Sequence, residues 1–394
     1  MDGFINLIKP AGMTSHDAVF MLRRILRTKK IGHTGTLDPM AMGVLPICLG
    51  KATRAAEYLE AEKKSYRCEM LLGYTSDTGD IWGNVSKCGD KTHHTDPEVT
   101  DIPEITYSIT RKDTMRNPSK EVSNAPNEAC NLPKEVSNAL EETCNSPNEA
   151  CNSPAEAHNP PDEAAFCEAI KSIKGRQLQQ PPAYSAVRKN GRRLYEYARD
   201  GIEIEVEPKE VFIYEIKPVK VLHEPGRAIF DVECSKGTYV RTICEDIGRK
   251  LGTNAIMTAL IRTSNGSFSI EEAHTFEEII DTVAQQTGLD YDGIINPGKK
   301  PEPLELDISE FILKTGEMLG SLGKIVLNET EFRKFVNGGK IAPRKITSQE
   351  KNARNSDSKF SNVYRVYSED GIFAGTAFFD KKRKVFTPEK VFFK

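Results

Sequence analysis

The chain has 394 residues, of which 38% are hydrophobic and 28% are charged, and its formal net charge at pH 7 is −3. This length exceeds one average domain, so we expect two domains plus connecting material in a globular protein. No apolar run approaches the roughly 20 residues of a membrane helix, and the N-terminus lacks the basic region of a signal peptide. These features exclude a membrane-spanning class and favour a cytoplasmic protein.

The nine cysteines are scattered along the chain, and no C-x-x-C pair occurs. An odd number of cysteines without close pairs argues against a disulfide framework and against a tetrahedral zinc site. The seven histidines show no ligand spacing either. The sequence therefore predicts a reducing compartment and no metal.

A helix is predicted from Thr14 or Ser15, either of which can cap it, to about Arg27, because Val19 and Leu22 recur at helical spacing. Basic side chains occupy its polar side and the residues after it: Arg23, Arg24, Arg27, Lys29 and Lys30. Such a face is either simply solvated or a contact for a phosphate backbone.

The stretch "GHTGTLDPMAMGVLPICLGKATR" (residues 32–54) contains one carboxylate, Asp38. Taken locally, Asp38 is a helix N-cap with Pro39 at the first helical position, or it is the centre of an active site. The same stretch is not a phosphate-binding P-loop, because six residues separate Gly43 from Gly50 where that motif has four. Ala52 also replaces the Ser or Thr that would hold magnesium.

A low-complexity acidic insertion is predicted at about residues 100–163, where "KEVSNA" and "PNEACN" each occur twice. Residues 117–165 contain two basic and nine acidic residues, so the rest of the chain has 52 basic and 48 acidic residues, a net charge of +4. A segment this poor in large apolar residues cannot offset its ordering entropy, so we expect it to be disordered and dispensable. The mildly basic remainder permits an RNA partner.

Further along the chain, residues 228–235 alternate between apolar and polar side chains, as a half-buried strand does. A turn at "SKG" leads into a predicted helix from Val240 to Leu251, with Gly252 placed to end it. Arg241 therefore lies at a strand-to-helix connection, a frequent place for functional side chains. Tyr66 alternates with Cys68 on another strand, where a half-buried aromatic residue is the simplest interpretation.

The C-terminal end differs from the rest of the chain in its pattern of apolar residues. Short strand-like runs such as "VYRVYS" and "IFAGTAFF" follow a helical "ETEFRKFVNGG". We expect a small β-rich domain over residues 328–394, after a larger domain over residues 1–327 that the insertion interrupts.

The segment around Asp38 fits the pattern G-H-x-G-T-L-D-P-x-A-x-G-V-L-P, which resembles the catalytic motif of the bacterial B-type tRNA pseudouridine synthases. Four further blocks resemble the same family in the same order: "INLIKPAGMTSHDAV", "KSYRCEMLLGYTSDTGDIWG", "QQPPAYSAVRKNGRRLYEYAR", and "CSKGTYVRTICEDIG" followed by "ALIRTSNGSF". The likeness covers roughly residues 3–270. It departs mildly at Ile173, where Phe is usual, and at Arg188, where Lys is usual.

The resemblance implies an α+β pseudouridine-synthase fold, with a mixed, mainly antiparallel central sheet flanked by helices and loops and a C-terminal PUA-like RNA-binding domain. It implies an isomerase that converts the uridine at position 55, in the T loop of tRNA, to pseudouridine. The C1′–N1 bond breaks, the flipped-out uracil rotates, and C5 joins C1′. We expect a monomer without cofactor or guide RNA.

By the same resemblance, the catalytic residues are Asp38, Tyr66 and Arg241. Asp38 either attacks C1′ or removes a sugar proton, and Arg241 keeps it charged. Tyr66 stacks on the base and is a candidate for handling the C5 proton. The predicted substrate-binding residues are Lys9, His33, Thr36, Asp80, Tyr184 and Leu260.

An alternative from a different class is an RNA-binding or tRNA-folding module that acts without catalysis, since base flipping alone could remodel the T loop. Asp38 discriminates the two, because only the enzyme needs its carboxylate.

Overall fold

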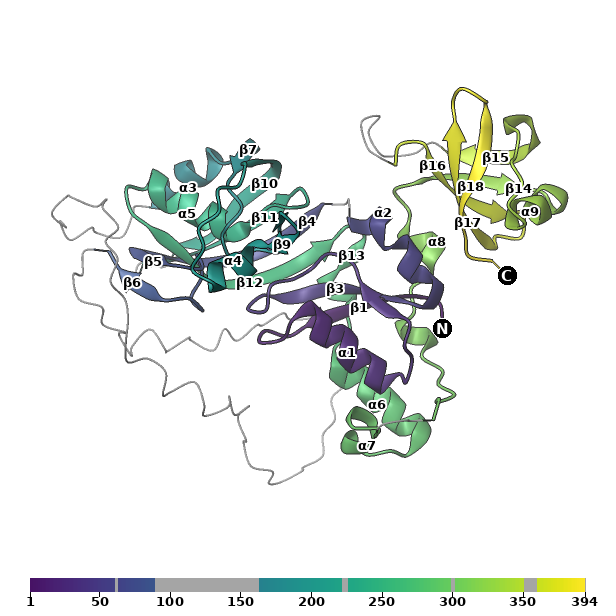
Figure 1. The fold of residues 1–394 in the computed structure, drawn as a ribbon, viewed down its shortest axis with the longest axis horizontal. Helices are drawn as coiled ribbons and strands as arrows, with labels where there is room; N and C mark the ends of the chain where they lie inside the picture. The colour runs from purple at the N-terminus through teal and green to yellow at the C-terminus, as the bar shows by residue number, and fades with distance from the viewer. Residues whose placement is uncertain (61–62, 89–162, 222–225, 299–301, 351–359, 394) are drawn as a thin grey trace. The chain divides into compact units, whose positions relative to one another are not determined.

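The computed structural model describes residues 1–60, 63–88, 163–221, 226–298, 302–350 and 360–393 (Figure 1). All but the last residue of the predicted acidic insertion lies outside these described residues. None of the helices in the described ranges has the length and apolar character that a bilayer crossing requires.

A nine-stranded sheet forms the larger part, in the order β1-β3-β12-β4-β11-β10-β7, with β2 paired to β3 and β13 paired to β12. Its neighbours run antiparallel except for β3 and β12, which are parallel. The predicted mixed, mainly antiparallel central sheet is therefore confirmed. The strands are β1 (Gly3–Lys9), β2 (Ile31–His33), β3 (Met42–Leu49), β4 (Lys64–Leu72), β7 (Gly175–Gln179), β10 (Lys209–Val221), β11 (Arg227–Cys234), β12 (Ala255–Asn265) and β13 (Phe268–Ser269).

Helices cover the sheet in two groups (Figure 1). The first group, α3 (Glu163–Lys171) and α5 (Val240–Lys250), packs on β4, β10 and β11 through a core that includes Phe166 and Ile243. The second group packs around β1 and β3 and consists of α1 (Ser15–Ile25), α6 (Phe276–Thr287) and α7 (Tyr291–Ile295). Burial of these apolar faces is the main force that holds the helices on the sheet.

The predicted N-terminal helix is confirmed as α1, and its cap explains where it begins. The Thr14 hydroxyl accepts a hydrogen bond from the Asp17 amide, and the Asp17 carboxylate accepts one from the Thr14 amide. This reciprocal capping box satisfies donors that a helix start leaves open. The predicted strand at residues 228–235 is β11, and the predicted helix after it is α5, which Leu251 and then Gly252 (φ +73°) terminate.

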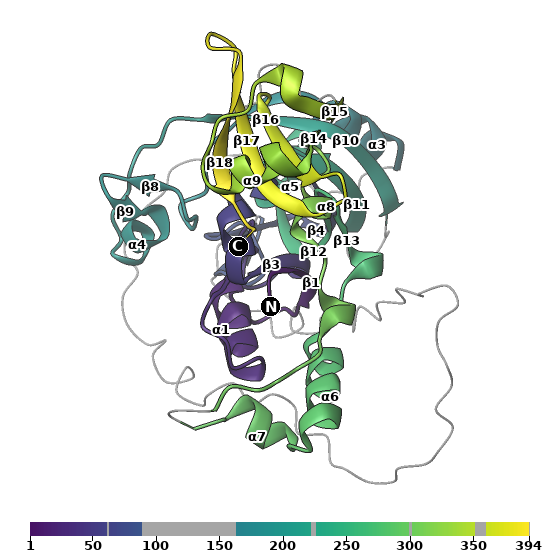
Figure 2. The same cartoon turned by 90° about the vertical axis from the view of Figure 1, so that its right-hand side faces the viewer.

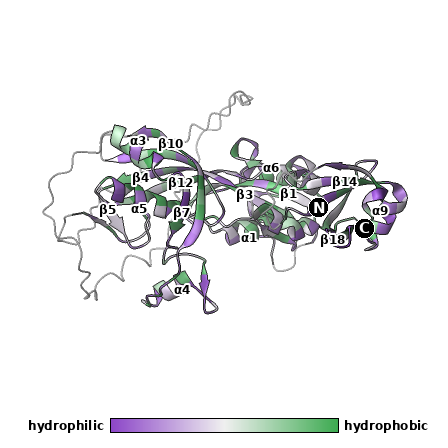
Figure 3. Ribbon diagram, turned by 90° about the horizontal axis from the view of Figure 1, so that it is seen from above, coloured by the Kyte–Doolittle hydropathy of each residue, from purple (hydrophilic) through white to green (hydrophobic). Residues whose placement is uncertain are grey.

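Smaller elements connect these layers. They are α2 (Ala56–Glu60), the hairpin of β5 (Tyr74–Ser76) and β6 (Val85–Lys87), the hairpin of β8 (Arg188–Lys189) and β9 (Arg192–Arg193), α4 (Leu194–Arg199), α8 (Thr315–Met318), and 3₁₀ turns at Gly50–Ala55, Ile270–Glu272, Ser309–Phe311 and Pro343–Lys345. The β8–β9 hairpin and α4 project from the central sheet in two views (Figure 2, Figure 3). Their exposed arginines make this projection strongly hydrophilic.

A separate five-stranded sheet forms the C-terminal part, in the order β15-β14-β16-β17-β18. The helix predicted from "ETEFRKFVNGG" is α9 (Glu329–Val336), and the other elements are β14 (Gly323–Leu327), β15 (Ile346–Glu350), β16 (Val363–Ser368), β17 (Phe373–Asp380) and β18 (Val385–Val391). β14 pairs with β15 and β16, so this sheet begins at Gly323, shortly before the predicted boundary at Leu327. The PUA-like character of this part stays a prediction.

Candidate active site

The loop that carries Asp38 connects β2 to β3 and contains no helix. The Ala41 amide donates to the Asp38 carbonyl at 3.1 Å, which makes a single turn, and β3 begins at Met42. The helix-cap interpretation of Asp38 is therefore wrong, because the sheet takes up the chain before a helix can form. The Asp38 side chain is 43% exposed, so its carboxylate is open to solvent.

Arg241, in the first turn of α5, is the buried centre of a cluster of acceptors. Its Nη2 lies 3.2 Å from Asp38 Oδ2 and donates to the Tyr184 carbonyl at 3.0 Å. Its Nη1 donates to the Thr78 carbonyl at 2.8 Å and lies 3.5 Å from Asp80 Oδ2. One guanidinium thus joins three segments that are distant in sequence and orients the Asp38 carboxylate from the protein side.

Asp80 is buried behind this guanidinium. Its Oδ1 accepts from the Thr78 hydroxyl at 2.8 Å and from the Trp82 amide at 3.0 Å. Burial raises the pKa of Asp80, while the Thr78 hydroxyl and the Arg241 charge act in the opposite direction. This carboxylate therefore supports the Arg241 guanidinium from behind, and its predicted role in substrate binding stays a prediction.

Tyr66 projects from β4 into the core that contains Leu37 of the Asp38 loop. Leu260 of β12 belongs to the same cluster, and its Cα is paired with Cys68 of β4. Burial raises the pKa of Tyr66 to about 12, and the Arg262 guanidinium acts against this rise. The phenol therefore lies in an apolar surround beside the loop that carries Asp38.

Lys9, at the end of β1, ties its own segment to the Asp38 loop. Its Nζ donates to the carbonyls of Pro10 and Met13 at 2.6 Å each, and to that of Pro39 at 3.3 Å. The side chain is fully buried. Burial and the Arg262 charge lower the pKa of Lys9 to about 8.

Two predicted substrate-binding residues stay apart from this cluster. The residue Thr36 is exposed, and its carbonyl accepts from Arg262 Nη1 at 3.2 Å. His33 is half-buried on β2, and its Nδ1 is buried without a hydrogen-bond partner among the described residues. Burial lowers the pKa of His33.

Arg262 was not predicted as a site residue, yet its guanidinium contacts the Asp38 loop directly. The block "ALIRTSNGSF" contains it, but nothing in those letters indicates that the arginine is fully buried. Only the pairing of β12 with both β3 and β4 brings it to this place.

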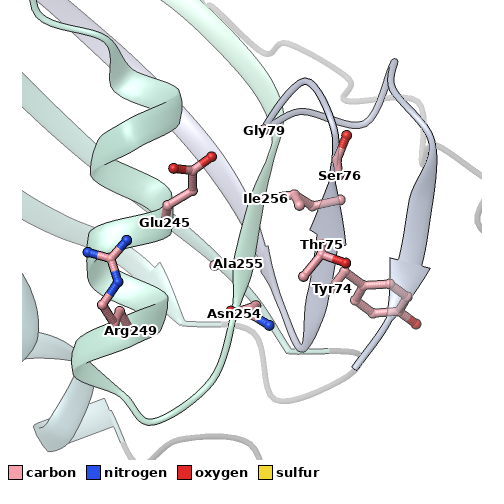
Figure 4. Close-up of a pocket in the computed structure, with 9 residues that line it drawn as sticks. All are labelled: Tyr74, Thr75, Ser76, Gly79, Glu245, Arg249, Asn254, Ala255 and Ile256. Atoms are coloured by element: carbon pink, nitrogen blue, oxygen red, sulfur yellow. The ribbon is translucent and has the colours of Figure 1, made fainter. Parts of the chain in front are cut away.

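No group of three or more His, Cys, Asp or Glu side chains suited to a metal occurs in the described part of the chain. A cavity of about 180 Å³ lies between α5 and β5, lined among others by Gly79, Glu245 and Arg249 (Figure 4). Neither Asp38 nor Tyr66 lines it. The open Asp38 surface is therefore distinct from this cavity.

The chain is similar over its whole length to the "tRNA pseudouridine synthase B" of Streptococcus sanguinis, with 35% identity and 100% of both chains covered. The family model "TruB family pseudouridylate synthase (N terminal domain)" matches residues 23–115 and 138–240, and "tRNA pseudouridylate synthase B C-terminal domain" matches residues 241–300. The chain belongs to the TruB family. It is therefore a member of a family of pseudouridine synthases, which are isomerases, and the resemblance predicted from the motif blocks is confirmed.

Other TruB-family relatives agree. The "tRNA pseudouridine synthase B" of Clostridium perfringens is 33% identical, covering 97% of this chain and 96% of the relative. That of Streptococcus pneumoniae is 40% identical, covering 72% of this chain and 75% of the relative.

Solved structures share the TruB-family fold at low sequence identity. The "Crystal Structure of a Cbf5-Nop10-Gar1 Complex" contains a chain with a TM-score of 0.60 and 20% identity, and 99% of this chain and 85% of that chain are covered. The "Structure of H/ACA RNP bound to a substrate RNA containing 2'-deoxyuridine" gives a TM-score of 0.59 and 18% identity, with 100% and 85% covered. These likenesses confirm the predicted fold class.

Proposed function

We propose that this protein is a tRNA pseudouridine synthase that isomerises the uridine at position 55, in the T loop. The observation that carries the proposal is the pair of Asp38 and Arg241, at 3.2 Å, in a chain of a pseudouridine-synthase family. The relatives' name, tRNA pseudouridine synthase B, supports tRNA as the substrate.

Asp38 is the proposed essential carboxylate. It acts on the ribose of the bound uridine, either by attack on C1′ or by removal of a sugar proton, and the C1′–N1 bond breaks with its electron pair on the uracil. The uracil rotates within the site and C5 bonds to C1′. On the first route the Asp38–C1′ bond breaks with its electron pair on the carboxylate, and on the second Asp38 returns the proton to the sugar. The C5 proton then passes to solvent, and N1 takes up a proton from solvent. Because 43% of its side chain is exposed, Asp38 is accessible to a nucleotide that has left its stack.

Arg241 is proposed to keep this carboxylate charged and pointed outward. A guanidinium cannot lose its proton in a protein, so a cation always stands beside this carboxylate. Asp80 and the carbonyls of Thr78 and Tyr184 hold the guanidinium from behind. A fixed attacking group gains rate because less orientation has to be achieved in the transition state.

Tyr66 is proposed to stack on the uracil and to assist loss of the C5 proton. Leu37 and Leu260, in the same apolar cluster, would exclude water from the detached uracil. Exclusion of water is what separates an isomerase from a glycosidase, which needs a water and usually a second carboxylate.

The other predicted residues have supporting roles in the proposal. Lys9 holds the Asp38 loop through Pro39, and Tyr184 contacts Arg241 through its carbonyl. His33 and Thr36 are proposed to meet displaced nucleotides at the edge of the site. The proposed enzyme acts as a monomer, without cofactor or guide RNA, and its C-terminal domain at residues 328–394 adds RNA contacts.

The test is to incubate the purified protein with an unmodified tRNA transcript and to map pseudouridine by carbodiimide primer extension. We expect a stop at the T-loop uridine, and no stop on a transcript in which that uridine is cytidine. No stop on the unmodified transcript would contradict the proposal. Asp38→Asn separates the enzyme from a non-catalytic RNA-folding module. A folding module would still remodel the T loop after this substitution, whereas the enzyme would no longer form pseudouridine.

A further inference from the structure

Arg262 lies on β12 between the two strands that carry the proposed active-site elements. Its Cα is paired with Tyr66 of β4 on one side and with Gly43 of β3 on the other. Directly opposed residues of antiparallel strands project to the same face of a sheet, so Arg262 shares the face of Tyr66. The arginine is 0% exposed.

The Arg262 guanidinium holds both ends of the segment that contains Asp38. Its Nη2 donates to the Gly35 carbonyl at 2.8 Å and its Nη1 to the Thr36 carbonyl at 3.2 Å. Its Nε donates to the Val44 carbonyl at 2.7 Å. A planar guanidinium presents its donors in a fixed fork, so these three carbonyls are set relative to one another.

The main chain is equally constrained at this place. Gly43 has φ +103°, and a Cβ there would lie 2.3 Å from the Arg262 carbonyl oxygen. β3 and β12 therefore approach so closely that only glycine fits at residue 43. Backbone and side chain of Arg262 both fix the exit of the Asp38 loop.

A buried positive charge is not needed merely to donate hydrogen bonds for structure, and burying the charge of Arg262 costs free energy of folding. Within the described residues its guanidinium donates to three main-chain carbonyls and also interacts with the Tyr66 hydroxyl, and no ion pair joins it to a carboxylate. Burying a cation without an anionic partner carries a large desolvation cost. The cation acts on its neighbours: it lowers the pKa of Lys9 and His33 and opposes the burial-driven rise in the pKa of Tyr66.

We propose that Arg262 is a positioning residue for the isomerisation. It fixes the Asp38 loop against β12 and beside the Tyr66 phenol, so that the carboxylate and the phenol meet one uridine at a set separation. The proposal rests on the proposed function, and it adds a residue that touches neither the ribose nor the base.

Two substitutions test this role. Arg262→Lys keeps the positive charge but loses the fork, and Arg262→Gln loses both the charge and the fork. The matched control is Arg365→Lys in β16 of the five-stranded sheet. Arg365 also donates to two backbone carbonyls, those of Leu322 and Gly316. The readouts are the single-turnover rate with protein in excess, the affinity for a T stem-loop RNA, and the thermal midpoint.

We expect both Arg262 variants to form pseudouridine about 100-fold more slowly than wild type, the loss that a displacement of about 1 Å can cause. Their RNA affinity and thermal midpoint should match those of Arg365→Lys. A rate equal to that of Arg365→Lys would overturn the inference. So would a parallel fall of rate, affinity and midpoint, because that pattern belongs to a residue needed only for folding.

If Arg262→Lys does not fold, the same three measurements on Arg262→Gln test the inference, since the neutral amide removes the buried charge. A wild-type protein that makes no pseudouridine would instead contradict the proposed function. That outcome is distinguishable, because both results that overturn the inference alone, an unchanged rate in the Arg262 variants or a parallel fall of rate, affinity and midpoint, require a wild type that forms pseudouridine.

Discussion

Arg241 Nη2 lies 3.2 Å from Asp38 Oδ2, although the two residues are 203 positions apart in the chain. The ion pair is asymmetric, since the side chain of Arg241 is 6% exposed and that of Asp38 is 43% exposed. The cation therefore stands on the protein side and the carboxylate on the side that an RNA can reach. This arrangement suits the role proposed for Asp38, a carboxylate that acts on a bound nucleotide while Arg241 holds it in place.

Arg241→Lys should lower the single-turnover rate of pseudouridine formation by about 100-fold, because an ammonium cannot span Asp38, Asp80 and two carbonyls at once. RNA affinity should change little. The control is Arg249→Lys on the same helix, where the side chain is exposed and pairs with Asp246. Equal rates for the two variants would show that the fork of Arg241 is not needed.

Asp80→Asn should slow the reaction and yet leave the free energy of unfolding at pH 7 unchanged or higher. Burial raises the pKa of Asp80 above its unfolded value, so the folded state holds this proton more tightly than the unfolded state. Its ionisation therefore costs stability, and wild type should gain stability relative to Asp80→Asn as pH falls from 7 toward 4. Urea unfolding at several pH values measures this difference.

The control for that series is Asp77→Asn in the same turn, whose exposed carboxylate accepts from the Asn84 amide. A wild type that loses stability relative to Asp80→Asn on acidification would contradict the assigned direction of the Asp80 shift.

Comparison with Lys9→Met should show that the charge on Lys9 lowers the free energy of unfolding of the wild type, and that this loss becomes smaller at alkaline pH. The pKa of Lys9 is lowered to about 8, so between that value and its unfolded pKa of 10.5 the unfolded state binds more protons. The stability of wild type relative to Lys9→Met should therefore rise by roughly 2 kcal/mol between about pH 7 and 9.5. Lys236→Met, at an exposed turn, is the control, and a flat difference for Lys9→Met would refute the prediction.

Tyr66→Phe should keep RNA binding, because the ring remains, and should slow the isomerisation if the hydroxyl assists proton loss. With its pKa raised to about 12, Tyr66 stays protonated throughout the assay range. The ratio of wild-type to Tyr66→Phe rates should therefore be constant between about pH 6 and 9. A ratio of rates that increases with pH would instead indicate a reactive phenolate. The control variant is Tyr74→Phe, on β5.

Much of the fold could be predicted where short-range patterns agree with the tertiary structure. The alternation at residues 228–235 has the period of a strand with one buried face, and β11 has that pattern. Thr14 and Asp17 stand at capping distance, and α1 begins there. Such local chemistry is readable because each signal involves neighbours in the chain.

The site was predictable only in part, since its contacts are long-range. Asp38 and Arg241 were found through the family motif, whereas local capping rules favoured a helix after Asp38 that β3 replaces. Asp80 was predicted as a substrate-binding residue, and its contact with Arg241, which the turn after β5 brings about, was not predicted. Arg262 was missed because its burial depends on strand pairing that no local pattern encodes.

The central claim is that Asp38, held by Arg241, converts a T-loop uridine to pseudouridine. Joining C5 to C1′ releases the hydrogen on C5, so a tRNA transcript tritiated at uridine C5 reports the reaction directly. We predict tritium release by wild type at the T-loop position, and none by Asp38→Asn although that variant still binds the transcript. Release by Asp38→Asn at the wild-type rate, or no release by wild type, would contradict this account.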